Sequence, residues 1–308
     1  MKKAVIFLLG CLISICSFAQ DYEMKQIAKF ENDKNKVYVR RYEEVAPQDD
    51  ISKNYLIFTT KGDLCMYQAD TSKMIYLNKK FALEKDVKMN LLIGPYDCKY
   101  TENHLLMSDK SGRIYLFDLD LKPKAYFETF DVFDTDNTGL WLSETYYNES
   151  SDILFFRDTK QNLYSLVHPS LNDDENRKNY KNPDETLNLF FNETIINNTS
   201  IRITKSGSLF INGNYTYFGQ QKNGNYVYQI NFDDCLVYDA KNPRTNFHVD
   251  CTSSNEQIES IAIHPCGDIY ILRMNWQTNT HNLYYIENTW DPEWREQWYK
   301  EHPDAVRP

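Results

Sequence analysis

An acidic stretch near the middle of the chain has carboxylates at the spacing that calcium-binding loops use. Asp134 and Asp136 occupy positions 1 and 3 of such a loop, and Gly139 occupies position 6. Carboxylate oxygens in a tight, glycine-containing turn are ligands that calcium prefers. Position 12 is Thr145, however, where a bidentate Glu is expected, and Glu144 stands one residue out of register. The sequence therefore favours an acidic β-turn here, with a calcium site at Asp134 and Asp136 as the alternative.

A second group of reactive residue types lies toward the C-terminal end, where His264, Cys266 and Asp268 are crowded together. A nucleophilic Cys or Ser needs a base within hydrogen-bond reach and a third group that orients this base. The sequence contains no Gly-x-Ser-x-Gly motif and neither of the glycine-rich phosphate-binding motifs, GxGxxG and GxxxxGK[ST]. We therefore interpret His264 and Cys266 as residues of a β-hairpin, and the sequence predicts no catalytic residue.

Aromatic residues are abundant, with 23 Tyr, 17 Phe and 5 Trp, and they are the third group that could recognise a ligand. Cross-strand pairs within sheets are expected to take up most of them. Four lie near the ends of expected loops, where an exposed ring can stack on a sugar or anchor a protein. These candidate binding residues are Trp141, Tyr146, Tyr147 and Trp276.

The elements that would position these residues are β-hairpins. Two short apolar segments around a polar corner recur five times, at residues 55–67, 105–118, 153–166, 201–211 and 261–272. Gly or Asn at such a corner adopts the positive φ that tight turns between twisted strands require. Corners separated by 46 to 60 residues are typical of propeller blades rather than of helical repeats.

The repeats predict an all-β fold, namely a β-propeller of about five to seven blades over residues 20–288. A β-sandwich is the alternative. A further hairpin at residues 226–238 falls within the longest interval and indicates a degenerate sixth blade. An N-terminal strand at residues 36–42 is expected to close the ring against the last blade.

The hairpin Ile-Ala-Ile-His-Pro-Cys-Gly-Asp-Ile-Tyr at residues 261–270 resembles the repeats of bacterial NHL- and gluconolactonase-like propellers. Those repeats also run as alternating apolar residues, a Gly turn and an apolar-Tyr-apolar strand. The resemblance covers little beyond the hairpins and implies a propeller fold. It transfers no site residue, and Arg273 stands where the NHL strand often ends in Asp, although Asp118 fits the second hairpin.

Residues 289–308 are predicted to form a C-terminal helix and tail. Asp291 is placed to cap the helix, Pro292 suits its first turn, and Pro303 lies just beyond its end. Trp290, Trp294 and Trp298 follow one another at intervals of four residues, which places them on one side of the helix. We expect this side to pack against the propeller.

The N-terminus predicts export. Lys2 and Lys3 precede an apolar run at residues 4–18, and Ser17-Phe18-Ala19 suits a cleavage site, so residues 1–19 read as a signal peptide. A retained anchor and a lipoprotein are the alternatives. The remaining 32 basic and 44 acidic residues give a net charge of −12, which argues against nucleic acid as a partner. No later apolar run is long enough to span a membrane.

These patterns together favour a non-catalytic, exported β-propeller that binds a protein or glycan in the cell envelope, in the periplasm or at the cell surface. A metal-dependent propeller hydrolase or lactonase is the alternative function. Its ligands would come one per blade at the central channel, and such ligands leave no local motif. A structural part of a larger surface assembly is the third option.

Overall fold

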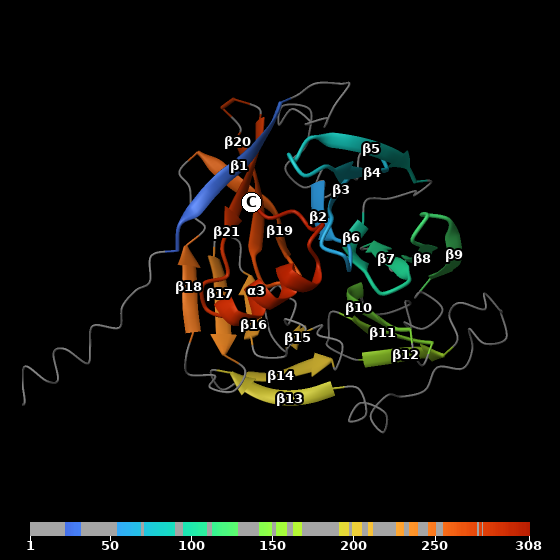
Figure 1. The fold of residues 1–308 in the computed structure, drawn as a ribbon. Helices are drawn as coiled ribbons and strands as arrows, with labels where there is room; N and C mark the ends of the chain where they lie inside the picture. The colour runs from blue at the N-terminus through green and yellow to red at the C-terminus, as the bar shows by residue number, and fades with distance from the viewer. Residues whose placement is uncertain are drawn as a thin grey trace, which may run out of the picture.

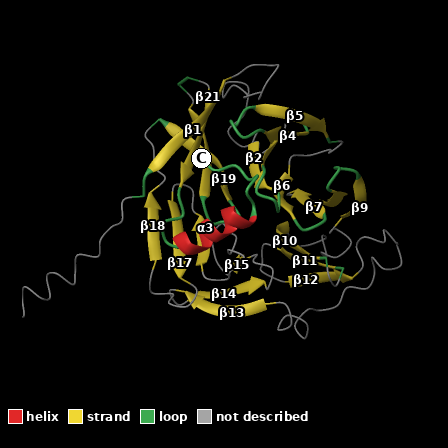
Figure 2. Ribbon diagram, viewed as in Figure 1, coloured by secondary structure: helices red, strands yellow, loops and turns green. Residues whose placement is uncertain are grey.

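The computed structural model of the chain describes residues 22–31, 54–68, 71–89, 95–109, 113–128, 142–149, 152–158, 163–167, 191–196, 199–204, 209–211, 226–230, 234–239, 246–250, 255–275, 277–278 and 280–308. Within these ranges the chain forms β-strands and one helix, α3 (Pro292–Glu301), as Figures 1 and 2 show. None of the described residues form a helix long and apolar enough to cross a membrane.

The described strands form six antiparallel sheets that follow the order of the chain, and neighbouring strands are consecutive in each except where β1 pairs with β21. The first sheet contains β2 (Asn54–Phe58), β3 (Leu64–Gln68), β4 (Lys73–Leu77) and β5 (Leu83–Lys88), and the second contains β6 (Pro95–Tyr100), β7 (His104–Asp109), β8 (Arg113–Asp118) and β9 (Pro123–Glu128). The third contains β10 (Leu142–Asn148), β11 (Ile153–Asp158) and β12 (Leu163–Val167), and the fourth contains β13 (Phe191–Ile196), β14 (Thr199–Thr204) and β15 (Leu209–Ile211). The fifth contains β16 (Tyr226–Ile230), β17 (Asp234–Asp239) and β18 (Asn246–Asp250), and the sixth contains β19 (Glu256–Ile263), β20 (Ile269–Asn275) and β21 (Thr280–Ile286).

A strand from the N-terminal end completes the sixth sheet. This strand, β1 (Met24–Glu31), pairs antiparallel with β21, from Met24 opposite Ile286 to Glu31 opposite Thr280. The expected strand at residues 36–42 lies outside the described residues. The strand β1 has only a weak pattern in the sequence, because Phe30 is its one buried residue and exposed charged residues interrupt it.

The six described sheets are arranged around a common centre (Figure 1), and apolar side chains join the fifth sheet to the sixth, the sixth to the first and the first to the second. Leu56 and Met66 of the first sheet pack with Tyr270 and Leu283 of the sixth. Other residues join the first sheet to the second (Ile57, Tyr67, Leu105, Met107) and the fifth to the sixth (Val237, Ile269, Ile271). Strands buried on both faces therefore read as continuous apolar runs, as in β3 and β20.

The five repeated hairpins do not occupy equivalent places in the sheets. Those at residues 55–67 and 261–272 join the first two strands of their sheets, β2–β3 and β19–β20. The other three join second and third strands, namely β7–β8, β11–β12 and β14–β15. The hairpin at residues 226–238 corresponds to β16 and β17 of the fifth sheet. The intervals between the hairpin corners therefore compare hairpins from two different places in the sheets.

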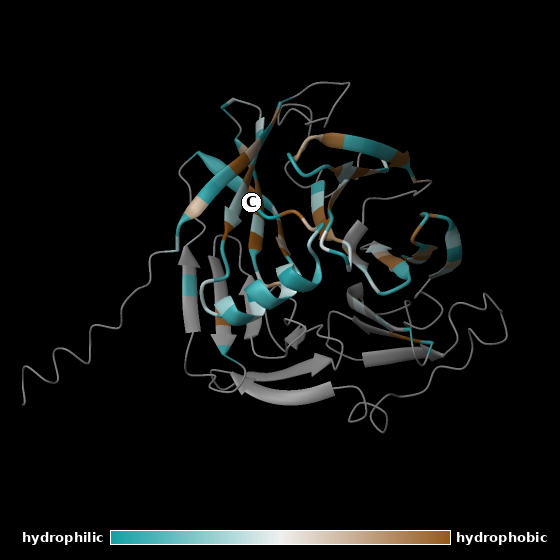
Figure 3. Cartoon of the chain, in the orientation of Figure 1, coloured by the Kyte–Doolittle hydropathy of each residue, from teal (hydrophilic) through white to brown (hydrophobic). Residues whose placement is uncertain are grey.

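The C-terminal helix begins at the expected residue and has the expected N-cap. Asp291 is its N-cap residue and accepts a hydrogen bond from the Trp294 amide, and Pro292 is the first helical residue. Its sequence, PEWREQWYKE, contains no aliphatic side chain, and Figure 3 shows the helix as hydrophilic beside the apolar strands behind it. Polar and aromatic contacts must therefore hold it in place.

Candidate functional site

The β2–β3 turn of the first sheet and the β19–β20 turn of the sixth sheet have the same backbone geometry. In the β19–β20 turn the His264 amide donates to the Asp268 carbonyl at 2.8 Å, and Gly267 has a φ of 92°. In the β2–β3 turn Thr59 and Asp63 make the equivalent bond at 3.0 Å, and Gly62 has a φ of 83°. Glycine suits both corners because a residue with a side chain rarely adopts such a φ.

The aspartates of these two turns have different surroundings. The Asp63 side chain is exposed, and its carboxylate accepts only a local hydrogen bond, from the Thr59 hydroxyl at 3.3 Å. Asp268 is fully buried, with 0% of its surface exposed. Because burying an isolated carboxylate is costly, Asp268 requires compensating donors.

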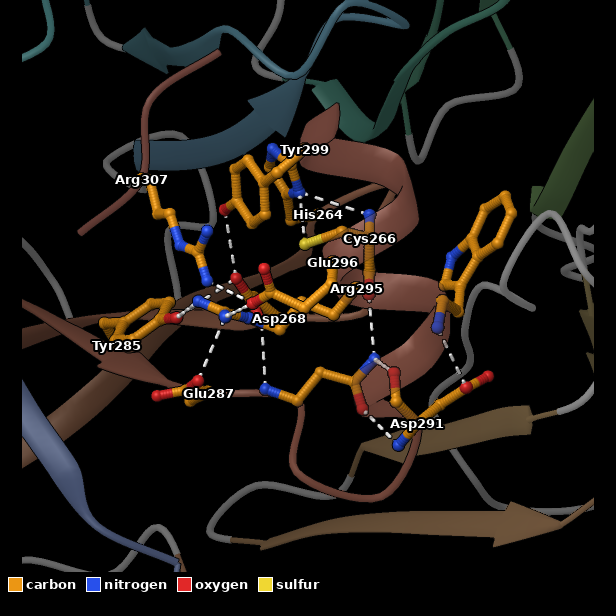
Figure 4. Close-up of polar contacts among 12 residues, drawn as sticks. His264, Cys266, Asp268, Tyr285, Glu287, Asp291, Arg295, Glu296, Tyr299 and Arg307 are labelled. Atoms are coloured by element: carbon orange, nitrogen blue, oxygen red, sulfur yellow. Dashed lines mark hydrogen bonds and ion pairs between the residues drawn. The ribbon is translucent and has the colours of Figure 1, made fainter. Parts of the chain in front are cut away.

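Four donors converge on the Asp268 carboxylate (Figure 4). Its Oδ1 accepts from the Asn288 amide and from Arg295 Nε, both at 2.8 Å, and its Oδ2 accepts from the hydroxyls of Tyr285 and Tyr299, both at 3.1 Å. Arg295 Nη2 in turn donates to the Tyr285 hydroxyl at 2.7 Å. The network joins the β19–β20 turn, β21 and α3 through the buried ion pair of Asp268 and Arg295.

The ionisation of these groups follows from the same contacts. Burial works to lower the pKa of Arg295, but the adjacent Asp268 carboxylate outweighs this and holds the pKa above its ordinary value. Burial, followed by the charge of Asp268, raises the pKa of Tyr285 and of Tyr299. The guanidinium therefore stays charged and both phenols stay protonated at neutral pH, which keeps all these donors available.

The start of the helix is also bound to the β19–β20 turn. Asn288 Nδ2 donates to the Cys266 carbonyl at 2.8 Å, and Asn288 Oδ1 accepts from the Asp291 amide at 2.9 Å. The indole nitrogen of Trp294 donates to the Pro265 carbonyl at 3.3 Å. The turn thus fixes both the N-cap and the first turn of α3.

Trp298 is the apolar centre of this contact and is 1% exposed. Its ring packs edge-on against His264, with centroids 4.5 Å apart, and stacks on His302 at 4.1 Å. A methyl group added at Gly62, in the first sheet, would lie 2.5 Å from Trp298 Cη2. Since Trp290 is also buried, the expected docking of the tryptophan side of the helix is confirmed.

His264 and Cys266 are in contact but do not form an activated nucleophile. The Sγ and Nδ1 atoms are 2.9 Å apart, and the Cys266 amide donates to the same nitrogen at 3.2 Å. Burial lowers the pKa of His264 to about 4 and raises the pKa of Cys266. At neutral pH the imidazole is therefore neutral and the thiol protonated, whereas a nucleophilic cysteine requires the thiolate.

A second buried carboxylate, that of Glu259, joins β19 to β2 at the end of β2 that lies away from the β2–β3 turn. Glu259 stands at a register shift in β19, between Ile258 and Ser260. Its Oε1 accepts from the Asn54 amide at 2.7 Å and from Asn54 Nδ2 at 3.0 Å, and its Oε2 contacts His281 Nε2. A bulge redirects a side chain in this way, and here it joins the sixth sheet to the first.

A third carboxylate joins the third sheet to the second. Glu149 accepts from the amide of Asn103 at 2.9 Å, lies 2.8 Å from His104 Nδ1 and contacts the Thr101 hydroxyl. Burial works to raise the pKa of Glu149, but the hydrogen bonds from Thr101, Asn103 and His104 outweigh it and hold the pKa below its ordinary value. The carboxylate is thus charged at neutral pH.

Most of the candidate residues from the sequence fall outside what the structure describes. Trp141, Trp276, Asp134 and Asp136 lie outside the described residues, so the aromatic and calcium predictions there stay predictions. Tyr146 lies in β10 opposite Phe155, with only its backbone described. Within the described ranges, no group of three or more His, Cys, Asp or Glu residues is arranged to hold a metal ion.

Tyr147 is the one candidate whose side chain the structure places. It is 4% exposed, its hydroxyl donates to Asp152 at 2.6 Å, and its ring packs edge-on against His104. In this conformation the ring contributes to the contact between the second and third sheets.

Asp268 was not recognised from the sequence as a special residue. Its Gly-Asp corner is the same as Gly62-Asp63, so local sequence does not distinguish the buried aspartate from the exposed one. The sequence feature that could have pointed to Asp268 is in the helix, where Arg295 and Tyr299 are four residues apart and therefore project from the same side. Only a partner for both on the sheet explains why that side is buried.

Antiparallel sheets in chain order around a common centre, with the last sheet completed by the N-terminal strand, define an all-β protein of the β-propeller class. No protein-family model matches the chain, and no curated protein matches it.

Several solved propellers are similar to the chain. The β-propeller domain of Myceliophteria thermophila Cps50 (Swd1) is 11% identical, over 76% of this chain and 96% of that chain, with a TM-score of 0.41. Streptogramin B lyase is 9% identical, over 86% and 88%, with a TM-score of 0.41. BamB from Moraxella catarrhalis is 8% identical, over 85% and 97%, with a TM-score of 0.37. Similarity this distant carries no argument about activity, and the propeller class rests on the chain's own sheets.

Proposed function

We propose that the chain is an exported, six-bladed β-propeller that binds a protein or a glycan in the cell envelope and does not act by catalysis. Each of the six sheets would be one blade, and β1 would close the ring by completing the last blade. The periplasm or the cell surface is the proposed location, because residues 1–19 have the pattern of a signal peptide.

One observation supports the non-catalytic part of this proposal. Within the part of the chain that the structure describes, three carboxylates with several hydrogen-bond donors serve to join structural elements. Asp268 bonds to Arg295 between sheet and helix, Glu259 bonds to Asn54 between the sixth and first sheets, and Glu149 bonds to the second sheet. A rigid frame with connecting loops is the usual arrangement of a binding scaffold, in which loops carry the recognition residues.

Trp141 and Trp276, predicted at loop ends, supply the proposed binding surface, whereas Tyr147 is buried in the structure. We expect purified protein to bind a glycan or an envelope protein in an array or crosslinking screen, with the dissociation constant then measured by calorimetry. Trp141→Ala and Trp276→Ala should each weaken binding by about tenfold or more, because buried aromatic anchors carry much of the binding energy. The control is Leu119→Ala, since Leu119 is 49% exposed and is not one of the predicted binding residues.

The same preparation tests the enzymatic alternative and the proposed calcium site. Hydrolysis of lactones or esters that stops with a chelator and returns with a divalent ion would contradict the binding proposal. Calcium binding that is lost in Asp134→Asn and Asp136→Asn would support the proposed site at these residues. Sequencing of the exported protein from its N-terminus should begin at Gln20, and a start at Met1 would contradict the export proposal.

A further inference from the structure

Both ends of the described chain are fastened to the sixth sheet. The N-terminal strand β1 extends its outer edge, and the C-terminal helix α3 lies on the turn between its first two strands. In the view of Figure 1, α3 lies in front of the centre around which the sheets are arranged. Its contacts place the helix where the sixth and first sheets meet.

The helix touches both of those sheets. Trp298 packs on His264 of the sixth sheet and occupies the space beside Gly62 of the first. Gly62 itself is buried. Between the two sheets, behind this contact, lies the apolar cluster that contains Leu56, Tyr270 and Leu283. Trp298 therefore covers one end of the contact between the sheets.

The ion pair of Asp268 and Arg295 determines where the helix sits. A buried ion pair adds little net stability over apolar packing, but loss of one partner leaves the other charged and buried. Arg295 is 3% exposed, and its outer nitrogen, Nη1, reaches Glu287 at 3.0 Å and Glu296 at 3.3 Å. The apolar contacts of α3 come from its aromatic residues, and the bond from Arg295 Nε to Asp268 sets the position of these rings on the turn.

We propose that α3 is a clasp that closes the contact between the sixth and first sheets. The clasp consists of α3, the β19–β20 turn with Asp268, and the β2–β3 turn with Gly62. When the helix is released, the two turns separate locally while the remaining sheets stay folded. The Glu259–Asn54 contact fastens the opposite end of the same strands, so the opening starts at the clasp and is limited by that second contact.

Hydrogen exchange measured by mass spectrometry on the full chain tests this proposal. In Asp268→Asn, peptides covering the β2–β3 turn and the β19–β20 turn should exchange about tenfold faster or more, because Arg295 Nε loses the buried carboxylate that ties the helix to the turn. Peptides from β7 and β8 in the second sheet should exchange as before. The control is Asp63→Asn, which makes the same change at the equivalent, exposed position and should leave all peptides unchanged.

Two outcomes of this experiment would overturn the proposal. Faster exchange confined to residues 287–308 would mean that the helix is docked without closing the sheets. Faster exchange of equal size in every sheet would mean that Asp268 supports only the overall fold.

A milder variant covers the case in which Asp268→Asn fails to fold. Tyr299→Phe removes one hydroxyl that donates to Asp268 and keeps the ring that packs on His264. It should accelerate exchange in the same two turns by about threefold to tenfold. Unchanged exchange in the β2–β3 turn of this variant would contradict the clasp.

Discussion

Position decides the role of each ionisable residue in this protein more than residue type does. His264 shows this for a base: its ring lies between Trp298 and Tyr299. Its Nδ1 accepts from the Cys266 amide, so the proton of the neutral ring is on Nε2. Desolvation of the ring disfavours the charged form, which makes a residue that could serve as a catalytic base into a packing residue.

The buried imidazole predicts a loss of stability in acid. The pKa of His264 is lowered from 6.5 to about 4 in the folded protein, so below pH 6.5 the unfolded chain takes up a proton that the folded chain does not. The free energy of unfolding should therefore fall as the pH drops from 6.5 toward 4, by up to about 3 kcal/mol from this residue. Urea unfolding at several pH values measures it.

The variant His264→Gln should flatten that dependence. Its stability at pH 7 will be lower because the ring contacts are lost, but its slope between pH 6.5 and pH 4 should be smaller than in the wild type. Gln277→Ala, at an exposed position and without a titrating side chain, should keep the wild-type slope. Equal slopes in His264→Gln and the wild type would show that protonation of His264 does not oppose folding.

At the scale of elements, the turn between the first two strands of a sheet recurs as the place where neighbours are joined. His264 in the sixth sheet packs beside Gly62 in the first sheet's turn, and Glu149 in the third sheet binds the turn of the second. Turns are short and expose backbone donors, so a carboxylate from the next sheet can satisfy them. A contact between neighbouring sheets is therefore polar at the turns and apolar between the strands.

The Glu149 contact should contribute measurably to the packing of the second and third sheets. Glu149→Gln keeps the shape but removes the charge that strengthens the bonds from Asn103 and His104, so we expect a loss of about 1–2 kcal/mol. Since the folded pKa lies below the ordinary 4.5, this difference is present above pH 4.5 and disappears as the pH falls below it. Chemical unfolding at pH 7 and at pH 3 compares the two.

The matched control for this prediction is Glu84→Gln, an exposed position in β5, which should change stability by less than about 0.5 kcal/mol. A loss as large in Glu84→Gln would attribute the effect to net charge instead. A loss in Glu149→Gln that persists at pH 3 would attribute it to packing of the side chain.

For the whole molecule, residues from both ends share one core. Phe30 of β1 belongs to the same buried cluster as Leu56 of the first sheet and Leu272 of the sixth, and a second cluster continues from the first sheet into the second. Because these clusters use opposite faces of the first sheet, the described sheets at this end of the chain should unfold together rather than one after another.

Phe30→Ala should therefore destabilise the described fold as one unit. Phe30 is 6% exposed, and truncation of a buried Phe costs about 3–5 kcal/mol. Tryptophan fluorescence, to which Trp290, Trp294 and Trp298 contribute, and far-UV circular dichroism should shift to the same lower midpoint. The control Lys29→Ala, at an exposed position of β1, should shift neither, and separate midpoints for the two probes in Phe30→Ala would contradict a shared core.

Many local elements of this protein, although not β1, follow from its sequence alone. The apolar segments of the hairpins, the glycine corners at Gly62 and Gly267, and the helix with Asp291 as its cap are all visible there. Each depends on residues a few positions apart, whose φ preference, capping and alternation act locally. The all-β propeller class could therefore be predicted.

The tertiary structure decided the contacts between distant residues. Asn54 meets Glu259 across 205 positions, β1 meets β21, and Trp298 meets Gly62. No local rule separates Asp268 from Asp63, because the backbone turn is the same and only the arrival of Arg295 and Tyr299 differs. Burial turns one of these aspartates into the residue that holds the C-terminal helix and leaves the other on the surface.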